Sequence, residues 1–99
     1  MTNKNNYIKG KNNYIKGITK SGFRFAIDKD RLENYELFEL IAENETNPMV
    51  MPKILVLLLG EKQKNNLLDF LRDKKGLVNV KRVEEELTSI FEQVKPIKN

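Results

Sequence analysis

The chain has 99 residues, of which 32% are charged and 39% hydrophobic, and its formal net charge is +4. This length and composition are typical of one globular domain with a modest hydrophobic core. The sequence contains no cysteine and no histidine, which excludes a disulfide framework, a thiolate metal site and the side chain that most often serves as general base or zinc ligand.

Residues 1–13 are predicted to be a flexible basic arm. They contain the heptapeptide KNNYIKG at residues 4–10, and a second copy of it begins at residue 11. Residues 1–24 hold basic residues and no acidic one, so the arm carries the positive charge. Asn- and Lys-rich sequence is typical of disordered segments. A unit of seven residues copied once is not a solenoid repeat. We interpret it as a duplication that a terminus tolerates, although the first copy could also add an edge strand or offer an alternative register.

Residues 14–28 are predicted to form a two-stranded β-ribbon. Phe23, Phe25 and Ile27 alternate with less apolar residues, which is the period of two expected for a strand with one buried face. The turn lies at residues 20–22, where Gly22 can adopt a positive φ. A ribbon alone is marginally stable in water, so its apolar face must pack on other elements.

Two helices are predicted between the ribbon and Gly60. The first begins at Asp30, which forms a capping box with Glu33, and ends near Glu43. The Asn47-Pro48 pair breaks the pattern, and a second helix begins near Pro48 or Pro52 and ends at Gly60. The apolar face expected for the first helix consists of Leu32, Tyr35, Leu37, Phe38, Leu40 and Ile41.

Two further helices are predicted after Gly60. The third runs from Glu61 to about Lys74, and the fourth runs from Asn79, its N-cap, to about Val94. The residues expected to face inward from the third helix are Leu67, Leu68, Phe70 and Leu71. Those expected from the fourth are Val83, Leu87, Ile90, Phe91 and Val94.

These elements predict a mostly helical α+β fold. An N-terminal two-stranded β-ribbon precedes about four packed α-helices, and the short connections favour helices that pack on their neighbours. We expect residues 14–95 to form a single compact domain and residues 96–99 to be a tail. The longest apolar run, residues 54–59, is far shorter than the roughly twenty residues of a membrane span. We therefore expect no membrane partner and a cytoplasmic location.

Few residues of the chain could carry chemistry. Glu84, Glu85 and Glu86 are consecutive, so they splay around a helix, and we interpret them as a solvated face. Asp28, Asp30 and Glu33 are interpreted as capping residues, because the segment lacks the glycine and the later glutamate of a calcium loop. No catalytic, cofactor-binding or metal-binding residue is predicted, and we expect a protein that is not an enzyme.

The second predicted helix is apolar on nearly all sides. Such a helix is either central in a core or partly covered by another chain, and methionines adapt to irregular apolar surfaces. The candidate surface for binding a client or a second copy consists of Phe23, Phe25, Met49, Val50, Met51, Leu55 and Leu58. The alternative is a helix that its own chain covers completely.

The chain from residue 19 to residue 91 resembles a known family. The motifs, in order, are the SGF ribbon, the acidic helix NYELFELIAENE, the NP break, LLLGEKQK, the turn KKGLV and the final helix EEELTSIF. This order is similar to that of the small tail assembly chaperones of long, non-contractile-tailed phages of Gram-positive bacteria.

The resemblance implies a non-catalytic chaperone, absent from the mature virion, that acts in the host cytoplasm. Such chaperones bind the tape measure protein, a long helical chain, and keep it soluble until tail-tube subunits polymerise around it. They commonly self-associate. The partners expected from the resemblance are therefore the tape measure protein, further copies of this chain and tail-tube subunits.

Two other functions are open. A small DNA-binding phage regulator would use the basic arm, but the helix after Gly60 carries acidic and apolar residues where a recognition helix needs groups that read bases. A structural head–tail or tail completion protein is the other, and it would be present in mature particles.

Overall fold

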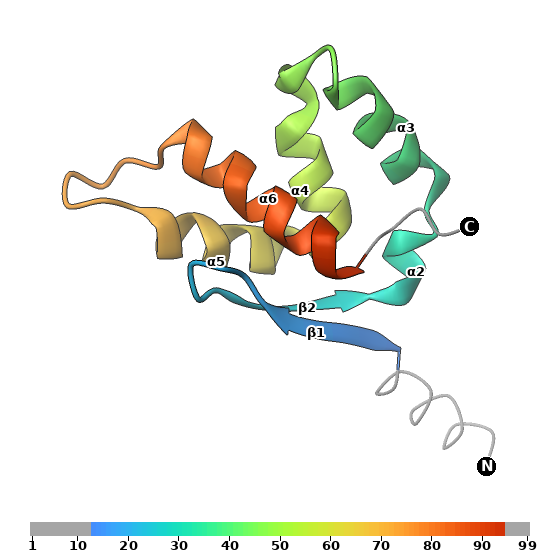
Figure 1. Cartoon of the computed structure of the whole chain (residues 1–99), viewed down its shortest axis with the longest axis horizontal. Coiled ribbons are helices and arrows are strands. Elements are labelled where there is room, and N and C mark those ends of the chain that lie inside the picture. Colours follow the sequence, from blue (N-terminus) through green and yellow to red (C-terminus); the bar gives the residue numbers. More distant parts are fainter. Residues whose placement is uncertain (1–12, 95–99) are drawn as a thin grey trace.

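The computed structural model describes residues 13–94 of the chain (Figure 1). An antiparallel β-ribbon is followed by packed helices, so the mostly helical α+β class is confirmed. The predicted basic arm, except Asn13, and the predicted tail 96–99 lie outside the described residues. The same is true of residues 4–10, the first copy of the repeat.

The β-ribbon forms within residues 14–28, as predicted. Strand β1 spans Tyr14–Ile18 and strand β2 spans Arg24–Asp28, with Ile15 opposite Ile27 and Gly17 opposite Phe25. Gly22 has a φ of 102° in the connecting turn, a conformation in which glycine carries no steric cost. Phe25 and Ile27 are buried, so β2 supplies the apolar face that packs on the helices.

The helix predicted from Asp30 to Glu43 is two helices, and Asp30 is not its N-cap. Helix α2 spans Lys29–Leu32, and the carboxylate of Asp28 caps it by accepting the N–H of Asp30 at 2.9 Å. Helix α3 spans Tyr35–Asn44, and the side chain of Asn34 accepts the N–H of Glu36 at 3.0 Å. The single-helix prediction was wrong because a short polar side chain that hydrogen-bonds nearby backbone favours a cap over a helix interior.

The predicted apolar face of this segment is also only partly buried. Leu37 is buried, whereas Tyr35 is 66% exposed and Phe38 is 44% exposed. Leu32, Leu40 and Ile41 are half-buried and pack against the core. Helix α3 lies at one end of the molecule (Figure 1), so one side of it contacts the core and its outer side faces solvent.

Helix α4 is the central element. The Asn47-Pro48 break becomes a 3-10 turn, η1, at Pro48–Val50, and α4 follows at Met51–Leu59. Gly60 ends α4 with a φ of 85°. The helix contacts β2, α2, α3, η1 and α5, and its buried residues are Met51, Ile54, Leu55, Leu58 and Leu59.

Helix α5 spans Glu61–Leu71 and ends before the predicted Lys74. The carboxylate of Asp73 accepts the N–H groups of Lys75 and Leu77 at 2.8 and 2.9 Å, and this loop competes with another helical turn. Leu67 and Leu71 are buried as predicted and Leu68 is half-buried, but Phe70 is 46% exposed. Its ring lies 5.5 Å from that of Phe23.

Helix α6 spans Val80–Val94. Asn79 caps it as predicted, accepting the N–H of Lys81 at 2.8 Å. The predicted inward residues Val83, Leu87, Ile90 and Val94 are buried, and Phe91 is half-buried.

Side-chain hydrogen bonds join the ribbon to α5 and α6. The Ser89 hydroxyl accepts the N–H of Lys20 at 3.1 Å, and Gln93 donates to the carbonyl of Ile18 at 2.8 Å. On the other edge, Gln63 accepts the N–H of Ala26 at 2.7 Å and donates to its carbonyl at 2.8 Å. The ribbon is thus held on both edges.

The acidic run on α6 is not a uniformly solvated face. Glu84 and Glu85 are exposed, but Glu86 is only 2% exposed, and the hydroxyl of Ser21 donates to its carboxylate. The solvated-face prediction was wrong for Glu86 because this position faces the turn of the ribbon. Within residues 13–94, no helix has the length and apolar character that crossing a membrane requires.

Candidate functional site

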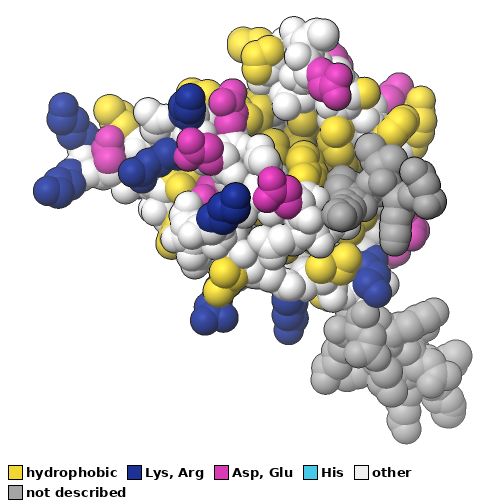
Figure 2. Space-filling view, in the orientation of Figure 1, with side chains coloured by type: hydrophobic (Ala, Val, Ile, Leu, Met, Phe, Trp, Pro, Cys, Tyr) yellow, Lys and Arg dark blue, Asp and Glu magenta, His cyan; other side chains and the backbone are white. Residues whose placement is uncertain are grey.

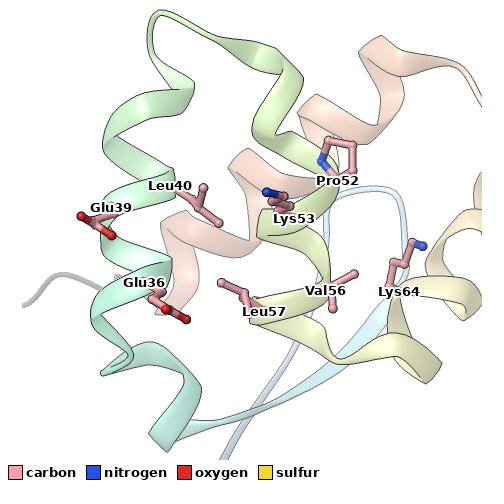
Figure 3. A pocket seen from close by; sticks show the side chains of 8 residues that line it. All are labelled: Glu36, Glu39, Leu40, Pro52, Lys53, Val56, Leu57 and Lys64. Carbon is pink, nitrogen blue, oxygen red and sulfur yellow. The ribbon is translucent and has the colours of Figure 1, made fainter.

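The candidate site is a groove of about 580 Å³ between α3, α4 and α5 (Figure 3). Its apolar residues come from α3 and α4, and its charged residues come from all three helices. The apolar residues are Leu40, Pro52, Val56 and Leu57. The charged residues are Glu36, Glu39, Lys53 and Lys64.

The all-round apolar character of α4 explains the groove. Ile54 and Leu58 point into the core and are fully buried. Val56 and Leu57 lie on other sides of the same helix and are half-buried. Because α3 and α5 leave these side chains partly uncovered, α4 contributes to the core on one side and to an apolar groove on another.

Charges of opposite sign enter the groove from different helices. Glu36 and Glu39 lie on α3, whereas Lys53 lies on α4 and Lys64 lies on α5 (Figure 3). None of these residues is in an ion pair with another described residue; the ion pair found within residues 13–94 joins Arg72 to Asp69 at 3.1 Å. The charges are therefore available to a bound partner.

Further apolar side chains are exposed near the groove, on α3 and η1. Met49, in η1, is 82% exposed. Tyr35 and Phe38 lie on α3 with their ring centroids 5.9 Å apart. Figure 2 shows hydrophobic side chains gathered over α3 and α4 on the face that it presents. An exposed apolar cluster rimmed by charge is typical of an interaction site.

The surface predicted from the sequence is mostly core. Phe23, Phe25, Met51, Leu55 and Leu58 are all at most 8% exposed, so in this fold they hold the domain together and are not accessible to a partner. The alternative interpretation, a helix covered by its own chain, describes these residues of α4 better. From the predicted surface, Met49 is exposed and Val50 is half-buried.

Sequence reasoning missed the groove residues. The sequence predicts a helix that is apolar on nearly all sides. It does not indicate which side of that helix α3 and α5 leave uncovered. Glu36 and Glu39 are three residues apart on one helix, so they lie on the same side of it. This spacing in the sequence predicts that the two carboxylates line the same side of α3.

A second hollow, of about 440 Å³, lies where the ribbon turn meets α6, is lined by polar and charged residues and includes the buried Glu86. One oxygen of this carboxylate, Oε1, has no hydrogen-bond partner among the described residues. Within residues 13–94, no group of acidic residues is placed to hold a metal ion.

No family model matches the chain, and no curated protein or solved structure is significantly similar to it. Its function is therefore inferred from the chemistry of the groove and from the motifs of residues 19–91.

Proposed function

We propose that this protein is a non-catalytic chaperone that binds an amphipathic helix of a client in the groove between α3, α4 and α5. The observation that carries the proposal is the groove's combination of an apolar floor, Val56 and Leu57, with charged residues on either side. Helices that bind proteins in grooves commonly bury one apolar face and leave polar flanks at the rim.

The proposed client is a phage tape measure protein. The support for this client is the resemblance of residues 19–91 to tail assembly chaperones, together with the chemistry of the groove. A long helical chain that awaits assembly exposes apolar stripes, and covering them keeps such a chain soluble. Self-association of the chaperone, contact with tail-tube subunits, action in the host cytoplasm and absence from the mature virion are parts of the same proposal.

The test is an aggregation assay with a helical fragment of a tape measure protein. Light scattering of the fragment is followed with and without the chaperone. The wild type should suppress scattering near equimolar ratio, and Val56→Glu should not, because it places a carboxylate in the apolar floor. Val80→Glu is the matched control, since Val80 lies on α6 and is 63% exposed. Equal suppression by the wild type and Val56→Glu would refute binding in this groove.

The second candidate function is DNA binding. Exposed basic residues surround the α5–α6 connection, where Figure 2 shows lysine and arginine side chains at one end of the molecule. Among them, Arg72 already donates to the carbonyl of Gly76 and to Asp69. A mobility-shift assay decides between the functions, because DNA binding would weaken steeply with salt whereas apolar client binding would persist. Presence in purified phage particles would favour a structural tail protein.

A further inference from the structure

From the groove's charge distribution we infer that it selects a client helix whose two flanks carry opposite charges, and that it binds this helix in one direction only. The inference rests on the proposed function and names the class of partner: an amphipathic helix with a basic flank against α3 and an acidic flank toward α5.

The rim of the groove is asymmetric in charge. Glu36 and Glu39 lie on α3, and the side chain of Lys53 reaches from α4 toward α3, so the α3 side carries more negative than positive charge (Figure 3). Lys64, on α5, places positive charge on the opposite side. A client helix that lies on Val56 with its apolar stripe down presents one flank to each side. Opposite flank charges form favourable pairs on both sides, whereas two flanks of the same sign form favourable pairs on one side and repulsive pairs on the other.

The same geometry determines the direction of the bound helix. If a helix keeps its apolar stripe on the floor but reverses its N-to-C direction, its flanks exchange sides. A helix with one basic and one acidic flank is then repelled on both sides of the groove. The apolar floor has no comparable polarity, so the rim charges determine the direction.

The experiment uses two designed peptides of about three heptads with Leu at positions a and d. In the segregated peptide, Lys occupies one flank and Glu the other. In the interleaved peptide, the same residues alternate along both flanks, so that composition, net charge and apolar stripe are unchanged. Fluorescence anisotropy gives the Kd of each. The segregated peptide should bind about five- to tenfold more tightly at low salt, and the difference should vanish near 1 M salt, where the Debye length is about 3 Å.

Direction is measured with a nitroxide at the N-terminus of the segregated peptide. Paramagnetic broadening should affect amide signals at one end of α4 only, either near Lys53 at its N-terminal end or near Gly60 at its C-terminal end. A variant with all four rim charges reversed (Glu36→Lys, Glu39→Lys, Lys53→Glu, Lys64→Glu) should move the broadening to the opposite end.

The control variant carries the same number of reversals away from the groove: Lys74→Glu, Lys75→Glu, Glu84→Lys and Glu85→Lys, all at exposed positions. It should keep the direction of the wild type, and circular dichroism verifies that both variants are folded. Equal affinity for the two peptides, or broadening at both ends, would overturn this inference and leave the proposed function intact. Failure of both peptides to bind would overturn the proposed function and this inference with it.

Discussion

The side chain of Gln63 closes the outer edge of β2, and replacing it tests how much the ribbon depends on α5. Its amide accepts the N–H of Ala26 at 2.7 Å and donates to the carbonyl of Ala26 at 2.8 Å. The amide also donates to the carbonyl of Leu59 at 3.1 Å, so Gln63→Ala removes three hydrogen bonds. Each is worth about 1 kcal/mol in net stability, and the higher helix propensity of alanine returns about 0.4 kcal/mol. We therefore expect the free energy of unfolding to fall by about 2.5 kcal/mol.

The assay is urea denaturation followed by circular dichroism, with thermal unfolding as a second measure. For a domain of this size, a loss of about 2.5 kcal/mol corresponds to a decrease in Tm of about 10–20 °C. Lys62→Ala is the matched control, because Lys62 is the preceding residue on α5 and is exposed. It should change the free energy of unfolding by less than about 0.5 kcal/mol. If Gln63→Ala were no more destabilising than Lys62→Ala, the edge of β2 would not need this side chain and the reasoning would fail.

Two further predictions concern the ribbon, and a third concerns the repeat that precedes it in the sequence. Ser21→Ala should lower the free energy of unfolding by about 2 kcal/mol, because the buried carboxylate of Glu86 loses the hydroxyl that donates to it. Urea denaturation measures this loss in the wild type and in the Glu86→Gln variant. The loss should be smaller in Glu86→Gln, and an equal loss in both would contradict the prediction. Gly17→Ala should destabilise by about 1–3 kcal/mol, since a Cβ there would lie 2.6 Å from the ring of Phe25; an unchanged Tm would show that the ring moves aside freely. Deletion of residues 4–10, the first copy of the repeat, should leave Tm and the molar mass from light scattering unchanged, and a large change in either would give that copy a role.

Local signals account for the parts of the fold that the sequence predicts well. The alternation in β2, the glycine turn, the Asn47-Pro48 break, the end of α4 at Gly60 and the Asn79 cap each depend on residues close together in the chain. The error at the first helix has a local origin too. Asp28, Asp30 and Asn34 are all able to cap, and the pattern alone does not rank them.

Tertiary context accounts for what the sequence did not predict. Glu86 is buried because Ser21, 65 residues away, supplies a hydroxyl to its carboxylate. The groove is open at Val56 and Leu57 because α3 and α5 pack on different sides of α4 and do not cover these two side chains completely. The residues predicted as a surface, such as Phe25 and Leu55, are apolar enough for either role, and only the packing of the ribbon on α4 assigns them to the core.

The hydrogen bonds between the ribbon and α6 also constrain the order of folding. They join residues 65, 69 and 75 positions apart, whereas α4 contacts α3 and α5, its neighbours along the chain, over short separations. Local contacts form fast, and distant ones must first overcome the entropy of closing a long loop. During synthesis, the three helices of the groove can therefore assemble while the ribbon is still unclosed on one edge. Closure waits until residues 86–93 have left the ribosome, so the surface proposed to receive a client takes shape before the domain that carries it is complete.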